Sequence, residues 1–180
     1  GSARDWGAAQ DEVDTPAVVG MDRPVLHKNI PKIAEGNDVV VIDGAARAEK
    51  MQTSAIKASD LVLIPVQPSA YDIWSSETVV DLVQARREVA GKPDAAFVVS
   101  RQIVGTNLAG EAQEALESFD LPVLEGRTAQ RVIYAEAASQ GLSVLDVDPS
   151  SKAADEVRSI VEDTLAILDM QTAKANGTAR

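Results

Sequence analysis

The sequence contains no cysteine, a single histidine and few aromatic residues. The absence of cysteine excludes disulfides, thiolate metal sites and cysteine nucleophiles. A histidine-based metal site or a Ser-His-Asp triad would rest on His27 alone, and its position beside Lys28 on an amphipathic helix favours a surface or packing role. Aromatic residues make up 3% of the chain, so we do not expect binding of single-stranded nucleic acid by base stacking.

Long apolar runs and an excess of positive charge are also missing. No segment approaches the roughly eighteen consecutive apolar residues that a membrane span needs, and no signal peptide opens the sequence. We therefore expect a soluble, cytoplasmic protein without membrane contact. The net charge of −11 argues against general coating of nucleic acid, because neutralising phosphates requires clustered lysine and arginine. Any contact with DNA must be local.

The chain has 180 residues, of which 45% are hydrophobic and 25% charged, enough for one globular domain with its own core. Apolar runs alternate with amphipathic segments, which predicts an α/β fold with a doubly wound, mostly parallel sheet flanked by helices. We expect the domain to cover residues 1–168, followed by a flexible tail at 169–180. The expected strands are 39–42, 61–66, 95–99 and 122–124, and the main helices are 49–58, 73–89, 107–118, 129–138 and 153–168.

The apolar run 39–42 ends in a carboxylate, Asp43. Such a β-branched run is typical of a buried parallel strand, which would place Asp43 at the carboxyl edge of the sheet, where open α/β folds bind ligands. In nucleotide hydrolases an aspartate at this place is the Walker B group, which holds the water shell of a magnesium ion. The alternative is a structural role, because aspartate also caps turns and helices at strand ends.

Longer stretches of the sequence resemble the ParA-type partition ATPases of the small plasmid-type branch. Residues 39–74 carry the resemblance with a strand ending in D-G, a helix and the run SDLVLIPVQPS at 59–69, and it continues through FVVSR at 97–101 and TAQRVIYAEA at 128–137. The resemblance implies a P-loop NTPase-like fold and an ATPase that segregates DNA, with ATP and magnesium as cofactors. It also implies an ATP-dependent homodimer, non-specific DNA binding at the nucleoid and a centromere-binding adaptor protein.

One motif of that family is missing. The deviant Walker A loop, K-G-G-x-G-K-[ST], supplies the amides and lysines that bind the phosphates, and none of the 11 glycines lies in such a setting. The opening residues resemble family sequence downstream of that loop, so we expect a fragment that lacks the first strand and the P-loop. A tag remnant is the alternative for Gly1 and Ser2. The chain as given should bind ATP weakly and show no ATPase activity.

Two further residues complete the implied nucleotide site. Ser100 and Arg101 directly follow the expected strand 95–99, at the sheet edge where the family contacts the base or ribose. Together with Asp43, which is also the implied catalytic residue and magnesium ligand through water, they form the nucleotide site that the resemblance predicts.

The resemblance also implies contacts with DNA phosphates. The matching positions are Arg131 at the start of a helix and Arg158 on the last helix, with Arg127 and Lys152 nearby. The alternative is that these cations form ion pairs within the chain, with Glu125, Glu136 or Asp155 as partners.

Two other functions remain open at this point. A MinD-like division-site ATPase ends in a basic amphipathic helix that lies on the membrane, whereas residues 169–180 contain two basic residues and no apolar stripe. A nucleotide-independent interaction module would use the same fold without the phosphate loop.

Overall fold

A small parallel sheet forms the centre of the molecule, which the computed structural model describes for residues 2–10, 16–44 and 48–177. Strand β1 (Leu61–Val66) pairs with strand β2 (Asp94–Val99), from Leu61 opposite Asp94 to Val66 opposite Val99. Helix α4 (Ala70–Ala90) makes the crossover that a parallel pair requires. Both strands lie where the sequence predicts them. Further helices are α1 (Ser2–Ala8), α2 (Leu26–Ile33), α3 (Glu49–Ala58), α5 (Leu108–Glu117), α6 (Val132–Ser139), α7 (Val144–Val147) and α8 (Lys152–Gly177).

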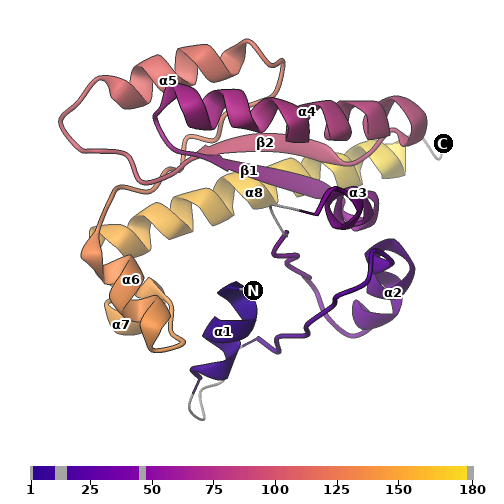
Figure 1. The fold of residues 1–180 in the computed structure, drawn as a ribbon, viewed down its shortest axis with the longest axis horizontal. Coiled ribbons are helices and arrows are strands. Elements are labelled where there is room, and N and C mark those ends of the chain that lie inside the picture. Colours follow the sequence, from indigo (N-terminus) through magenta and orange to yellow (C-terminus); the bar gives the residue numbers. More distant parts are fainter. Residues whose placement is uncertain (1, 11–15, 45–47, 178–180) are drawn as a thin grey trace.

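The sheet is covered by helices on both faces: α4 and α5 lie on one side and α8 crosses the other (Figure 1). Strand β2 explains the cover on both faces. Its residues 95–99 are all apolar, and successive side chains point to opposite sides of the sheet. Ala95, Phe97 and Val99 belong to the core with α4 and α5, whereas Ala96 and Val98 pack with apolar residues of α8. The α/β class and the parallel pairing are thus confirmed, while the larger doubly wound sheet stays a prediction.

A third extended segment runs beside β2. Phe97 forms a parallel bridge with Val123, and Gln102 forms one with Ala129. The strand predicted at 122–124 is therefore present only as single bridges. The reason is Gly126, which leaves the sheet and packs so tightly on α8 that a Cβ there would lie 2.5 Å from the backbone nitrogen of Ile160.

The ends of α4 follow the rules of helix capping. The side chain of Ser69 accepts a hydrogen bond from the backbone N–H of Asp72, and Gly91 ends the helix with a positive φ of 70°. Helix α6 begins at Val132, three residues later than predicted, because Ala129 and Gln130 still pair with Gln102. Helix α8 is longer than predicted and continues beyond residue 168 to Gly177.

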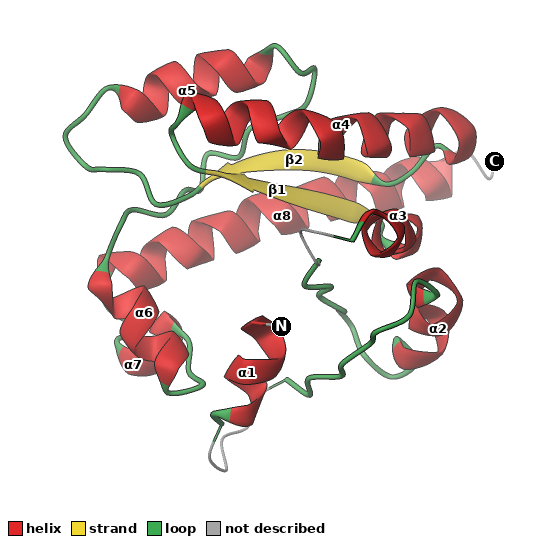
Figure 2. Cartoon of the chain, viewed as in Figure 1, coloured by secondary structure: helices red, strands yellow, loops and turns green. Residues whose placement is uncertain are grey.

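The segment 39–42 corrects the prediction of a buried strand. It is a loop in the structure (Figure 2), and the side chains of Val39 and Val41 are 63% and 88% exposed. An apolar run becomes a buried parallel strand only when a neighbouring strand pairs with it and helices cover its faces. Among the described residues, β1 pairs with β2 alone, and no strand occupies its other edge.

Helices α1 and α2 lie apart from α4 and α5, on the opposite side of the sheet (Figure 1). Helix α1 is held by Trp6, whose indole N–H donates to the carbonyl of Leu142 at 3.1 Å. Helix α2 packs on α3. No helix among the described residues has the length and apolar character needed to cross a membrane.

Candidate functional site

Asp43 lies against the beginning of α1 and is exposed. Its Oδ2 atom accepts hydrogen bonds from the Ser2 hydroxyl at 3.0 Å and from the Ala3 backbone N–H at 3.2 Å. A carboxylate at this place satisfies a free backbone donor of the helix and complements the helix dipole. The structure therefore shows Asp43 as a cap, and the helix that it caps precedes it in the sequence by about forty residues.

The surroundings of Asp43 show whether this residue fits the role of a magnesium ligand. A carboxylate is a ligand type that magnesium uses, and the ion is usually bound by one or two carboxylates together with waters and phosphates. The two hydrogen bonds engage only Oδ2, so Asp43 fits as a single ligand. No group of three or more metal-binding side chains occurs among the described residues, and residues 45–47 lie outside them. The assignment stays a prediction.

Ser100 and Arg101 lie at the carboxyl edge of the sheet, as the sequence predicts. The Ser100 N–H donates to the carbonyl of Val66 at 2.9 Å, and the Arg101 N–H donates to the Thr128 hydroxyl at 3.1 Å. Arg101 has a left-handed backbone with φ of 54°, a strain of order 1–2 kcal/mol. The structure thus joins Ser100 to the end of β1 and Arg101 to Thr128, but it shows Asp43 bonded to α1 instead.

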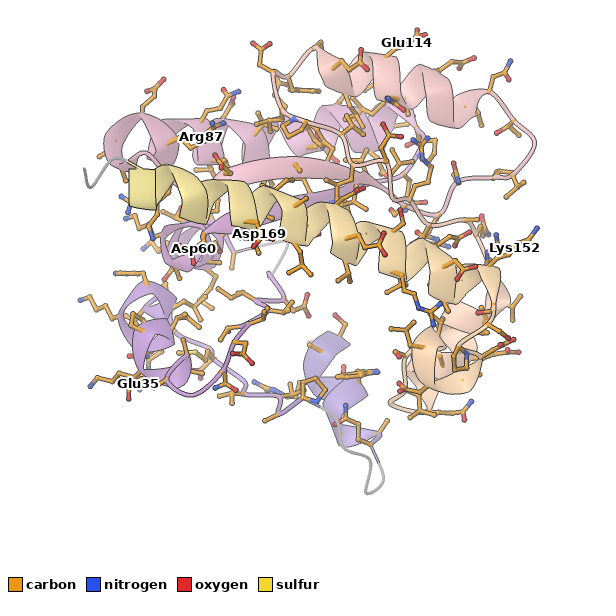
Figure 3. All side chains as sticks on the ribbon, turned by 180° about the vertical axis from the view of Figure 1, so that it is seen from behind. Glu35, Asp60, Arg87, Glu114, Lys152 and Asp169 are labelled. Atoms are coloured by element: carbon orange, nitrogen blue, oxygen red, sulfur yellow. The ribbon has the colours of Figure 1, made fainter. Side chains whose placement is uncertain are left out.

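Arg127, Arg131 and Lys152, three of the cations that the resemblance implies for DNA contact, gather at one surface. A groove of about 350 Å³ lies between the loop at 125–131 and the first turns of α8. We call it the arginine groove. Lys152, at the start of α8, marks one end of that helix in Figure 3. Arg158 does not line the groove. The lining residues are Glu125, Gly126, Arg127, Arg131, Lys152, Asp155, Glu156 and Ser159.

Glu156 organises the arginine groove. Its Oε1 accepts from Arg131 Nε at 3.0 Å and Nη2 at 2.7 Å, while its Oε2 accepts from the Tyr134 hydroxyl at 2.8 Å and the Ala129 N–H at 3.1 Å. The carboxylate thereby joins α8 to α6 and to the segment beside β2. The side chain of Glu156 is only 16% exposed, and that of Arg131 is 29% exposed, so this pair is partly shielded from solvent.

These contacts shift the pKa values of all three side chains. The hydrogen bond to Glu156 raises the pKa of Arg131. Burial opposes the charge of Glu156, but the hydrogen bonds from Arg131, Ala129 and Tyr134 outweigh it and lower its pKa. Burial, followed by the bond to Glu156, raises the pKa of Tyr134 well above its ordinary value. At neutral pH the groove therefore holds an ionised Arg131–Glu156 pair and a neutral tyrosine.

Sequence reasoning missed Glu156 as the partner of Arg131. The sequence predicts Glu125, Glu136 and Asp155 as partners of the cations, because these acidic residues lie close to the arginines along the chain. The available signal was the helical position of Glu156, three residues after Ala153 and four before Ile160 on the packed face of α8. A charged residue on such a face needs a partner.

Arg127 and Arg158 also have partners within the chain. Arg127 donates to the Glu125 carbonyl at 3.1 Å and to Gln113 Oε1 at 3.3 Å. Arg158 pairs with Asp155 at 3.0 Å and donates to the Pro149 carbonyl at 2.7 Å. The Arg158–Asp155 pair and a 4.0 Å contact between Arg127 Nη2 and the Glu125 carboxylate agree with the ion-pair alternative. Contact of the three arginines with DNA stays a prediction.

Two known proteins are similar to this chain, although no protein-family model matches it. The first is Maintenance of carboxysome distribution protein A of Halothiobacillus neapolitanus, which is 26% identical over 163 residues, or 89% of this chain and 75% of that protein. The second is Cell division protein PomZ of Myxococcus xanthus, 29% identical over 134 residues. That match covers 71% of this chain and 41% of PomZ. Both similarities span most of the chain.

Proposed function

We propose that this chain is a ParA-type ATPase that positions a cargo in the cell. The observation that carries the proposal is the similarity to Maintenance of carboxysome distribution protein A along 89% of the chain. The family resemblance at 59–69 supports it, because these residues form β1 and the turn that caps α4 at the carboxyl edge of the sheet. The cargo is DNA, as in partition, or a large assembly like the one in the relative's name.

The proposal includes the cofactors and partners of that family. ATP and magnesium are the proposed cofactors, with Asp43 holding magnesium through water and with Ser100 and Arg101 beside the base or ribose. Magnesium supplies charge neutralisation at the phosphates. An ATP-dependent homodimer, an adaptor protein and association with the nucleoid complete the proposal. The described residues supply only part of such a site, so these statements concern a form of the protein that carries a phosphate-binding loop.

The arginine groove is the proposed DNA contact. An arginine has five N–H donors, and none of the hydrogen bonds among the described residues uses Nη1 of Arg131. Arg131 can therefore donate to a phosphate while it keeps its bonds to Glu156. The net charge of −11 repels DNA elsewhere, so binding depends on this local group of cations. Lys152 is exposed at the same groove and adds a positive charge.

A second candidate function is a nucleotide-independent interaction module. The observation in its favour is the position of Asp43, which caps α1 while the segment before it is a loop. In that case Asp43 stabilises α1 and has no part in phosphate chemistry.

Substitution of Asp43 by asparagine separates the two functions. Asparagine keeps an oxygen that accepts from Ser2 and Ala3, but it removes the negative charge that a magnesium shell requires. In a form of the protein that carries a phosphate-binding loop, we expect Asp43→Asn to abolish ATP hydrolysis while the melting temperature stays close to that of the wild type. The matched control is Asp38→Asn in the same loop, which should hydrolyse ATP normally. If the Asp43→Asn variant hydrolysed ATP at the normal rate, Asp43 would have no role beyond capping α1.

A further inference from the structure

A second cavity lies between α2 and α3, and we call it the α2–α3 cavity. Its volume is about 270 Å³. The contribution of α3 comes from one face of the helix, since the residues follow each other at spacings of three and four. Neither Asp43 nor any residue of the arginine groove takes part. The lining residues are Pro24, His27, Glu49, Lys50, Thr53, Ser54 and Lys57.

A pair of hydrogen-bonding groups forms the inner wall of this cavity. Ser54 is buried, with 3% of its surface exposed, and its hydroxyl lies 3.0 Å from Nδ1 of the half-buried His27. If Nδ1 carries the hydrogen, it donates to Ser54, whose own hydroxyl hydrogen is then available. If Nε2 carries the hydrogen, the hydroxyl donates to Nδ1 and the Nε2–H is available. The pair therefore retains a donor in either tautomer, and the hydroxyl of Thr53 adds another.

The outer wall of the cavity is positively charged. Lys50 and Lys57 are exposed, and among the residues that the structure describes neither forms an ion pair. Glu49 is the one acidic lining residue. This local excess of positive charge contrasts with the net charge of −11 of the chain. Two ammonium groups beside hydroxyl and imidazole donors match an anion with several acceptor oxygens.

We propose that the α2–α3 cavity binds a small oxyanion of the phosphate class, with Lys50 and Lys57 pairing its charge and the His27–Ser54 pair donating hydrogen bonds. The size of the cavity supports a small ligand, because sites for drug-sized molecules occupy about 300–1,000 Å³. Inorganic phosphate and a small phosphomonoester share this chemistry. The proposal is independent of ATP hydrolysis and of DNA binding.

The test uses His27 as a built-in probe, because it is the only histidine of the chain. Its ring C–H signals are followed by NMR while the 180-residue protein is titrated with inorganic phosphate, with glycerol 3-phosphate, and with sodium chloride at matched ionic strength. We expect a saturating shift with at least one of the two phosphates and no saturating shift with chloride. The compound that saturates at the lower concentration identifies the source of the anion.

Variants assign the binding to the cavity. Lys50→Gln and Lys57→Gln should each weaken binding about two- to fivefold, the range that an exposed ion pair gives. Lys32→Gln on α2 is the matched control outside the lining and should leave the affinity unchanged. Circular dichroism confirms that each variant is folded. The proposal is overturned if phosphate and chloride give the same non-saturating response, or if all three variants bind as the wild type does.

Discussion

At the scale of single residues, the partner of each charged group decides what it can do. Arg131 and Asp43 were both assigned to phosphate chemistry from the sequence, and both have structural partners. Arg131 keeps unused donors beside an open groove, whereas one oxygen of Asp43 accepts both bonds from α1. Structural and functional roles are therefore compatible at Arg131, and Asp43→Asn distinguishes them at Asp43.

Glu156 gives a prediction on stability and pH. Its pKa is lowered in the folded protein, so its contribution to stability is present above the ordinary glutamate pKa of about 4.3 and is lost as the pH falls toward the folded value. We expect Glu156→Gln to lower the free energy of unfolding at pH 7 by about 1 kcal/mol, which is less than the roughly 1.5–3 kcal/mol of hydrogen bonds to charged groups, because the pair is partly exposed.

Urea unfolding at pH 7 and at about pH 3.5, below the ordinary glutamate pKa, measures this effect. The difference between wild type and Glu156→Gln should shrink at the lower pH. Glu162→Gln, at an exposed position of the same helix, is the control and should behave as the wild type. If wild type and Glu156→Gln differed in free energy of unfolding by the same amount at both pH values, the ionised carboxylate would contribute nothing to stability.

At the scale of elements, close packing of α8 on the sheet fixes the arginine groove. The loop at 125–131 reaches α8 through Gly126, whose N–H donates to Asp163 Oδ2 at 2.8 Å. The same contact interrupts the pairing of this segment with β2. The groove therefore rests on the helix–sheet packing beneath it, where Leu124 and Ile160 meet.

We expect Gly126→Ala to destabilise the protein by about 1–3 kcal/mol, the usual cost of overpacking. The added Cβ would lie 2.5–2.8 Å from backbone atoms of Ser159 and Ile160, and backbone atoms cannot move aside as a flexible side chain does. Gly110→Ala is a control of opposite sign, because nothing lies within 4 Å of its Cβ and it is part of α5. It should stabilise the protein by about 0.5–1 kcal/mol. Thermal unfolding measures the melting temperatures of both variants. Equal changes in melting temperature for Gly126→Ala and Gly110→Ala would contradict the packing argument.

At the scale of the whole molecule, the ion-paired cations Arg87 and Lys92 lie far from Lys152 of the arginine groove (Figure 3). Arg87 pairs with Asp94 at 3.5 Å and Lys92 pairs with Asp60 at 2.9 Å, both near the amino end of the sheet. Lys152 lies at the other end of the molecule from Arg87 (Figure 3). Substitutions at the two ends therefore distinguish the loss of a local contact from a change in net charge.

The DNA prediction follows from this separation. In an ATP-bound form of the protein that carries a phosphate-binding loop, we expect Arg131→Ala to weaken DNA binding evenly across unrelated duplexes. The slope of log affinity against log salt should fall by about 0.9 for one lost phosphate contact. Arg87→Ala removes an equal charge at the far end and should leave the slope unchanged. An unchanged slope in folded Arg131→Ala would limit Arg131 to its bond with Glu156.

The sequence by itself determined the elements whose signals are local. The apolar runs of β1 and β2 each lie within a few residues, and both strands appear in the structure where the sequence predicts them. The stretch 59–69, which carries the resemblance, is local in the same way and forms β1 and the turn before α4.

Only the tertiary structure decided where distant partners meet. The run 39–42 has the composition of a buried strand, but a strand needs a neighbour, and none pairs with it among the described residues. Arg131 has several acidic residues nearby in sequence, yet its partner lies 25 positions away on the packed face of α8. Periodicity depends on neighbours in the chain, whereas strand pairing, burial of a run and the partner of a charge depend on the packing of whole elements.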